Sequence, residues 1–286
     1  MNKNESQKGT FENSSQMIQD IIFGLNKQEL IPIITEIGAI PEDIGHDSSE
    51  EKLFAKVSDI VLAKCFQELG FKSTVNKERA NCADVVAKSQ FHEYTFVGDA
   101  KSFRLSRTAK NQKDFKVKSM ADWKGDNDYS VLVCPYYQYP KSRSQIYGQA
   151  LNDNITLFAW EYLSILLENN IHESEEIDLS NLLNVSLVLS KNINIAERNN
   201  CFLLNQDAII SSYLKLDDTA FNAYFEKYKR NIITRGEIEI KYWEDKITEI
   251  KQYTREKAIS ELLISLKLNE KISSIKKYID SLRNEE

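Results

Sequence analysis

Glycine and proline are scarce in this chain, which has 9 glycines and 4 prolines among its 286 residues. That scarcity excludes collagen-like and low-complexity architectures, and it predicts long regular elements joined by few tight turns. Hydrophobic residues make up 42% of the chain and charged residues 28%, which is enough apolar material for one large domain or two smaller ones. We therefore expect a folded protein in which helix predominates.

Several other patterns are also missing. The 4 cysteines lie far apart without a C-x-x-C pair, and none of the 3 histidines stands at a metal-ligand spacing from another. These absences disfavour zinc sites, dense disulfide frameworks and Ser/His or Cys/His catalytic groups. No apolar run approaches the roughly 18 residues that cross a bilayer, and the polar N-terminus does not resemble a secretion signal. We expect a cytoplasmic protein without a membrane partner, whose chemistry uses carboxylates and lysine.

Positive charge is concentrated in one segment. The formal net charge of -6 by itself argues against a polyanionic partner. Residues 101–118, however, contain 7 lysines and arginines against 1 aspartate, a local +6, so the other residues sum to -12. Ser, Thr, Asn and Gln stand between these basic residues. Because such side chains together supply contacts to phosphates and to base edges, the segment favours DNA binding over a merely solvated loop.

The spacing of apolar residues predicts an α/β protein. A helical lead-in over residues 1–47 is followed by a helix over residues 48–70, which begins at a capping box formed by Ser48 and Glu51. Short β-branched or alternating runs then predict strands, with a further helix over residues 144–151. The strands are expected at residues 83–87, 93–97, 131–134 and 155–159. This alternation indicates a mixed β-sheet flanked by helices.

Three parts are expected along the chain: the helical lead-in, a catalytic core over residues 48–168 and a mainly helical C-terminal region over residues 169–286. In the last part, Ile240, Trp243 and Ile247 recur at helical spacing, which indicates an amphipathic helix whose apolar face needs a partner. A helical layer of the same chain, packed on the core, is the favoured partner, and a self-association surface is the alternative.

Asp84, Asp99 and Lys101 form the candidate catalytic site. Each carboxylate stands on or at the end of a predicted strand, and two carboxylates from adjacent strands can hold Mg²⁺, which prefers oxygen ligands. Positions i and i+2 of a strand point to the same face, so Asp99 and Lys101 are expected to meet. The cation would polarise a phosphodiester while Lys101 orients water or offsets the developing charge. Acid-x-Lys is a weak pattern by itself, and a surface ion pair at a strand end is the alternative.

Two acidic residues precede these strands. Glu51 is better explained by helix capping than by a place in the site. Asp59 stands in the middle of the predicted helix among apolar residues, and the choice between a polar helix face and the active site is left open.

The pattern of Asp84, the strand ending at Asp99, and Lys101 resembles that of the PD-(D/E)xK nuclease family. The likeness to type II restriction endonucleases of that family covers most of the chain beyond the helical lead-in, and it is strongest from Asp99 through the basic segment. It implies that Asp84 and Asp99 bind Mg²⁺, with the main-chain carbonyl of Ala100 as a third ligand, and that Lys101 is the catalytic lysine. Ala83 stands where the family has proline, which affects only the entry to the strand.

The resemblance also implies which residues meet DNA. The contacts are divided between bases and phosphates, with residues 111–113 in the major groove. They are Arg104, Arg107, Lys110, Asn111, Lys113, Lys116 and Lys118. Glu78 and Asp114 are charged neighbours that would tune the site.

By the same resemblance, the chain is a Mg²⁺-dependent type II restriction endonuclease that cuts double-stranded DNA at the palindrome AAGCTT and leaves 5′ overhangs. A palindromic site implies a two-fold symmetric homodimer in which each subunit cuts one strand. A companion DNA methyltransferase is expected in the cell, not as a stable subunit. Two alternatives stay open: a structure-specific repair or junction-resolving nuclease on the same core, and a sequence-specific DNA-binding protein without catalysis.

Overall fold

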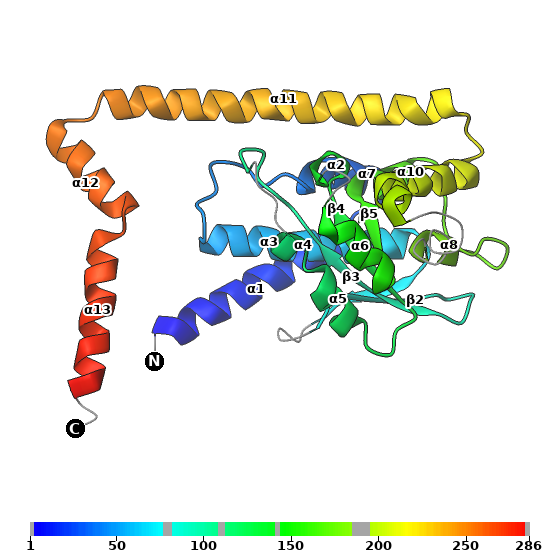
Figure 1. The fold of residues 1–286 in the computed structure, drawn as a ribbon, viewed down its shortest axis with the longest axis horizontal. Coiled ribbons are helices and arrows are strands. Elements are labelled where there is room, and N and C mark those ends of the chain that lie inside the picture. The colour runs from blue at the N-terminus through cyan, green and yellow to red at the C-terminus, as the bar shows by residue number, and fades with distance from the viewer. Residues whose placement is uncertain (1–2, 77–81, 108–111, 141–143, 185–194, 284–286) are drawn as a thin grey trace. The chain divides into compact units, whose positions relative to one another are not determined.

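The computed structural model describes residues 3–76, 82–107, 112–140, 144–184 and 195–283 of the chain (Figure 1). Its contacts divide the chain into two compact units, Met1–Arg235 and Gly236–Glu286, which we call the N-terminal unit and the C-terminal unit and describe separately. The division at residues 1–47, 48–168 and 169–286 stays a prediction. Among the described helices, none has both the length and the apolar composition needed to span a membrane.

The N-terminal unit is built on a mixed sheet of five strands within the described residues. They are β1 Lys72–Val75, β2 Val85–Lys88, β3 Thr95–Ala100, β4 Tyr129–Cys134 and β5 Ile155–Ala159. The strands lie side by side in chain order; β1, β2 and β3 are antiparallel, whereas β3, β4 and β5 are parallel. The predicted α/β fold with a mixed sheet is confirmed, and β3 is the strand at which the two kinds of pairing meet.

Helices surround this sheet and continue beyond it. Those of the N-terminal unit are α1 Lys3–Gly24, α2 Lys27–Ile37, α3 Ser49–Glu68, α4 Gln112–Phe115, α5 Val117–Lys124, the 3-10 helix η1 Tyr136–Gln138, α6 Gln145–Asn152, α7 Trp160–Glu168, α8 Ser180–Leu183 and α10 Ile195–Leu214. Helix α11, Asp218–Lys251, runs from the N-terminal unit into the C-terminal unit, which also holds α12 Arg255–Ser265 and α13 Leu268–Arg283.

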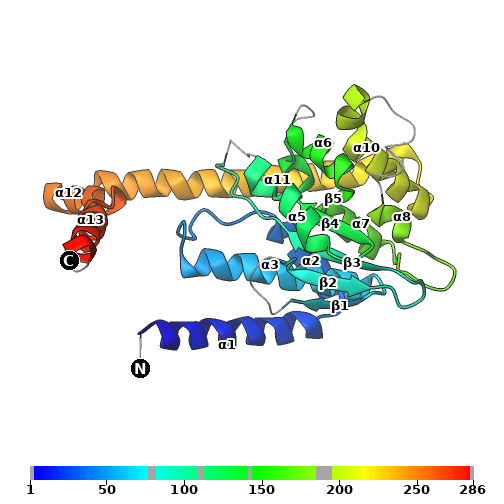
Figure 2. The ribbon, with the colours of Figure 1, turned by 60° about the horizontal axis from the view of Figure 1, so that its bottom comes forward.

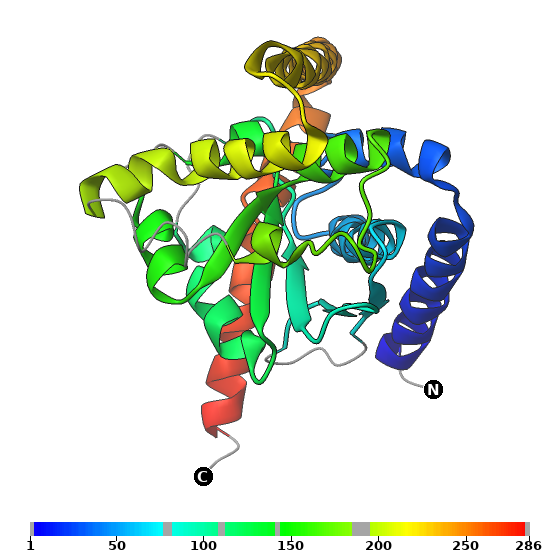
Figure 3. The same ribbon diagram turned by 90° about the vertical axis from the view of Figure 1, so that its right-hand side faces the viewer.

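The sheet separates two apolar cores. On β4, Val131 and Val133 point into the core that holds α3 and α7, whereas Leu132 and Cys134 point into the core formed with α5 and α6. This alternation follows from the two-residue period of a strand. Helices therefore cover both faces of the sheet (Figure 3), and α1 lies beside α3 (Figure 2). The central strands are shielded from water on both sides.

Several elements differ from the sequence prediction, among them the unpredicted helices α4 and α5 and strand β2, which begins two residues later than expected. Strand β1 was not predicted, because this edge strand begins with polar residues and alternates between exposed and buried positions. The strand predicted at residues 93–97 begins two residues later and continues to Ala100. Helix α7 was not predicted either, since eight of its nine residues, including Glu161 and Ser164, are buried and a helix that is buried all round has no clear polar face to detect.

The predicted capping box at the start of α3 is half correct. The Ser48 hydroxyl accepts a hydrogen bond from the Glu51 N–H at 3.0 Å, as expected of an N-cap. The predicted reciprocal bond, from the Ser48 N–H to the Glu51 carboxylate, is wrong. The Glu51 carboxylate accepts instead from the N–H of Asp47, at 2.7 Å. The reason is a competing partner, because Arg104 donates to the same carboxylate at 2.6 Å and draws it toward the loop.

Candidate active site

A cleft of about 710 Å³ lies beside the end of β3 in the N-terminal unit. Its lining includes Lys52, Lys56 and Asp59 from α3, Asp84 next to β2, Asp99, Ala100 and Lys101 from the end of β3, and Arg107, Lys113, Asp114 and Lys116 from the basic segment. The fold thus brings the three predicted catalytic residues together with part of the predicted DNA-binding segment.

Asp84 and Asp99 lie opposite each other at the ends of the adjacent strands β2 and β3. Strands β2 and β3 are antiparallel, with Val85 paired to Gly98, so the next pair outward is residue 84 with residue 99. Burial, a hydrogen bond to Asp99 and the negative charge of Asp99 together raise the pKa of Asp84 to about 7, although the charges of Lys101 and Lys56 oppose them. Two like charges in a partly dry site oppose each other's ionisation. The pair therefore carries negative charge that an added cation would stabilise.

Asp59 joins this pair from the side of α3. Gly98 makes the approach possible, because a Cβ atom there would lie only 3.0 Å from the Phe66 ring of α3. Burial raises the pKa of Asp59 well above its usual value, and the charges of Asp84 and Asp99 add to that effect. The structure thereby answers the question that the sequence left open: Asp59 belongs to the cleft. The available signal was an acidic residue inside a helix segment that is otherwise buried.

Lys101 is held at both its side chain and its backbone. Its ammonium group forms an ion pair with the Asp99 carboxylate, so the two residues meet as predicted. Its N–H donates to the carbonyl of Val133 at 2.7 Å, which extends the pairing of β3 with β4. Its carbonyl accepts from the indole N–H of buried Trp160 at 3.1 Å. These contacts fix the position of the lysine at the edge of the cleft.

The donor set of the cleft suits a hard divalent cation. Asp59, Asp84 and Asp99 offer carboxylate oxygens, which are the ligands that Mg²⁺ and similar cations prefer. Ala100 also lines the cleft, so the predicted ligation by its main-chain carbonyl is sterically reasonable, although it stays a prediction. Thiol and imidazole groups, the usual ligands of softer metals, are absent from the described lining of this cleft.

The basic segment divides into residues with partners inside the protein and residues that face solvent. Arg104 donates to the Pro41 carbonyl at 2.8 Å as well as to Glu51, so its guanidinium braces the loop before α3. Arg107 pairs with Asp114 at 2.6 Å. Lys113, Lys116 and Lys118 are exposed, and the first two line the cleft. Contacts of these residues with DNA stay a prediction.

Three predicted site residues lie outside the described residues: Glu78, Lys110 and Asn111. Conversely, the structure adds Lys52 and Lys56 of α3, which were not among the predicted site residues. Both lysines lie on the cleft side of α3, whose other basic and acidic residues are scattered. Their helical spacing from Asp59 was the only signal that could have indicated them. Lys56 lies one turn before Asp59, and its ammonium group is 3.8 Å from the Asp59 carboxylate.

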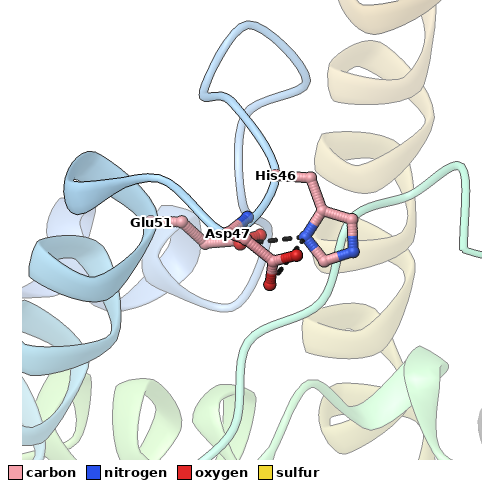
Figure 4. A group of neighbouring side chains, drawn as sticks. All are labelled: His46, Asp47 and Glu51. Carbon is pink, nitrogen blue, oxygen red and sulfur yellow. Dashed lines mark hydrogen bonds and ion pairs between the residues drawn. The ribbon is translucent and has the colours of Figure 1, made fainter. Parts of the chain in front are cut away.

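A second acidic group lies at the start of α3 and is largely exposed (Figure 4). The His46 Nδ1 atom lies 3.1 Å from Glu51 and 3.7 Å from Asp47, so these three side chains could offer ligands to one ion. Partial burial raises the pKa of Glu51, but hydrogen bonds from Arg104, the Asp47 N–H and His46 outweigh it and lower the pKa overall. The Glu51 carboxylate is therefore already paired with a positive charge of the protein.

A buried group of carboxylates with one lysine, at the end of a central strand of a helix-flanked mixed sheet, is consistent with an α/β nuclease fold. Comparison with known proteins agrees with this class. Residues 10–279 match the model of the HindIII restriction endonuclease family. The chain is also 40% identical over 274 residues, 96% of its own length and 91% of the relative's, to the type II restriction enzyme HindIII of Haemophilus influenzae strain Rd. The chain therefore belongs to the HindIII restriction endonuclease family.

Proposed function

We propose that the protein is a type II restriction endonuclease that uses Mg²⁺ to hydrolyse one phosphodiester in each strand of double-stranded DNA. The observation that carries the proposal is the cleft in which Asp59, Asp84 and Asp99 gather beside Lys101. The family match over residues 10–279 and the similarity to the type II restriction enzyme HindIII over 96% of the chain support the same activity. Asp84 and Asp99 would hold the cation, and Asp59 would add a third carboxylate.

The residues of the cleft divide the chemistry among them. When bound, Mg²⁺ supplies polarisation of the phosphodiester and acidifies a water molecule. Lys101 can orient the attacking water and offset the negative charge that develops on the phosphate. Lys52, Lys56 and Lys116 place positive charge on the walls of the cleft, where they can neutralise neighbouring phosphates of the strand. Arg104 is better suited to bracing the loop, because its guanidinium already has two partners.

We further propose AAGCTT, cut to leave 5′ overhangs, as the site, and a homodimer as the active form. The similarity to the HindIII enzyme supports this specificity, and a palindrome matches the two-fold symmetry of a dimer. The remaining predicted DNA-binding residues, Arg107, Lys110, Asn111, Lys113 and Lys118, would be shared between bases and phosphates. Such an enzyme would work in the cytoplasm beside a methyltransferase that protects the cell's own DNA.

The direct test is cleavage of a plasmid by the purified full chain with Mg²⁺, followed by sequencing of the ends. We expect cuts at AAGCTT only. Asp99→Ala should lose cleavage by at least about 1000-fold while still binding the site, because it removes a ligand rather than a DNA contact. Asp153→Ala is the matched control, since this exposed aspartate follows α6 and does not line the cleft.

Each other outcome has a definite meaning. An intact plasmid, where a commercial enzyme cuts it, contradicts the proposal. Cleavage confined to branched DNA without a fixed sequence indicates a repair or junction-resolving nuclease. Specific binding of AAGCTT without any cleavage indicates a DNA-binding protein that has no catalysis. Normal cleavage by Asp99→Ala shows that the cation site has been placed wrongly.

A further inference from the structure

Glu42 is a buried residue whose carboxylate holds the start of the basic segment. It stands in the loop between α2 and α3 and is only 6% exposed. Both carboxylate oxygens bind the same residue: Oε1 accepts from the Ser106 N–H at 3.0 Å, and Oε2 accepts from the Ser106 hydroxyl at 2.9 Å. Withdrawing a carboxylate from water is costly unless hydrogen bonds compensate it, and bonds to an ionised acceptor are strong. Glu42 therefore sets the position of Ser106 firmly.

The same loop also pairs with the basic segment just before Ser106. The Phe103 N–H donates to the Gly38 carbonyl at 3.1 Å, and the Ile40 N–H donates to the Phe103 carbonyl at 3.2 Å. Phe103 is buried, so this part of the segment is fixed by its side chain as well as by its backbone. The two bonds of Glu42 extend the contact between the loop and the segment as far as residue 106.

Ser106 belongs to a turn over residues 104–107, which the Arg107 N–H closes by donating to the Arg104 carbonyl at 3.2 Å. The Arg104 guanidinium holds the start of the turn, whereas Ser106 and Arg107 at its end are exposed. Among the described contacts, those of Glu42 tie the end of the turn to the loop between α2 and α3. Arg107 lines the cleft, so Glu42 helps to set the point from which this side chain enters it.

We propose that Glu42 is a positioning residue that sets sequence discrimination, an inference that rests on the proposed function. The catalytic lysine is held independently, since the backbone of Lys101 binds Val133 and Trp160. Loss of the Glu42 bonds should therefore leave the cleavage site in place while the turn gains freedom. Bases are distinguished by donors held in a fixed geometry, whereas a flexible surface also adapts to wrong partners. A loosened turn would thus accept altered sites that wild type rejects.

The test compares a duplex that contains AAGCTT with duplexes in which one base pair of the site is changed, cut by the full chain with Mg²⁺. Discrimination is the ratio of the kcat/KM values. Glu42→Ala should lower this ratio by at least about tenfold, while the single-turnover rate on AAGCTT falls by less than about threefold. Ser106→Ala removes only the hydroxyl bond, so it should lower the ratio by about threefold. The double variant should be no worse than Glu42→Ala, because both residues act through one contact.

Glu173→Ala is the matched control for the loss of a buried carboxylate. Glu173 is 1% exposed, accepts hydrogen bonds from the hydroxyls of Ser89 and Tyr94, and does not line the cleft. This variant should unfold at a lower temperature and keep wild-type discrimination. Ser106→Ala changes an exposed residue, so it should keep the fold and decides the question if Glu42→Ala does not fold.

The other results contradict the inference. Unchanged discrimination in Glu42→Ala and Ser106→Ala shows that other contacts hold the turn. An equal loss of cleavage on the AAGCTT and altered duplexes makes Glu42 a residue of general stability, and a loss of discrimination in Glu173→Ala has the same meaning. Wild type that fails to cut AAGCTT overturns the proposed function together with this inference. Wild type that cuts AAGCTT, with unchanged discrimination in the variants, overturns this inference alone.

Discussion

Two acidic groups lie at different points along α3, and they differ in how their charge is balanced. Asp59, Asp84 and Asp99 are withdrawn into the cleft, where burial and mutual repulsion raise the pKa of the first two. At the start of the helix, Asp47 and Glu51 lie near solvent, and the pKa of Glu51 is lowered by hydrogen bonds from Arg104, the Asp47 N–H and His46, although its partial burial opposes them.

The difference teaches which group needs an external cation. Ligand atoms gather closely at His46, Asp47 and Glu51, yet Arg104 already compensates the most buried carboxylate there. In the cleft, the positive charge of Lys101 and Lys56 only partly offsets that of the aspartates, whose pKa values stay raised where the shift is resolved. Proximity of ligands alone is therefore a weaker criterion than uncompensated buried charge.

The largest effect that would sharpen this comparison is on catalysis. Lys101→Met should lower the single-turnover cleavage rate by about 100-fold to 1000-fold, because it removes the cation placed to stabilise developing charge. Lys56→Met, which removes a lysine from the wall of the same cleft, is the matched control and should cost about tenfold or less, since it affects phosphate binding. Equal losses in the two variants would contradict a special role for Lys101.

A smaller effect concerns stability and pH. The folded-state pKa of Asp84, about 7, lies above the ordinary value of 3.8, so ionisation of this group destabilises the fold. That destabilisation is complete above pH 7 and is relieved as the pH falls from 7 toward 4. Asp84→Asn should therefore raise the free energy of unfolding at pH 8, without divalent cation, by on the order of 1–3 kcal/mol, and by less at pH 5.

Thermal unfolding in EDTA and in Mg²⁺ measures this effect. Mg²⁺ should raise the unfolding temperature of wild type at pH 8 and should have little effect on Asp84→Asn, because the ligand pair is broken. Asp153→Asn, an exposed aspartate away from the cleft, serves as the control. A variant that is less stable than wild type at pH 8 would show that the Asp84 charge is compensated inside the protein.

Much of the fold could be predicted because its signals are local. The capped start of α3 and the apolar strands β4 and β5 follow from propensity and periodicity, and Asp99 and Lys101 meet because a strand has a two-residue period. Strand β1 was missed because a polar edge strand owes its pairing to its neighbour. Helix α7 was missed because it is buried all round, which removes the periodicity.

The rest of the site depends on contacts between distant residues. Asp59 enters the cleft because Gly98 allows α3 to pack closely on β3. The residues that neighbour Asp59 and Gly98 in the sequence give no sign of this contact. The hydrogen bond from the Trp160 indole to the Lys101 carbonyl joins residues 59 positions apart, so the local sequence could not predict it either. The resemblance to the nuclease family indicated which residues matter, whereas the role of Arg104 as a brace for Glu51 became visible only in three dimensions.

The smallest predicted effect belongs to the exposed group and has the opposite sign. The pKa of Glu51 is lowered in the folded state, so its charge stabilises the fold above pH 4.5 and that stabilisation is lost as the pH falls through the folded-state value. Glu51→Gln should therefore lower the free energy of unfolding at pH 8 by about 1 kcal/mol, since Arg104 loses its charged partner. Cleavage should change by less than about threefold, and the stabilisation by Mg²⁺ should persist, because Glu51 does not line the cleft.

Glu50→Gln is the control, because the Glu50 carboxylate lies one residue away and has no arginine partner in the described structure. If Glu51→Gln abolished the Mg²⁺ effect while Asp84→Asn preserved it, the two acidic groups would exchange roles, and the cation would belong at the start of α3.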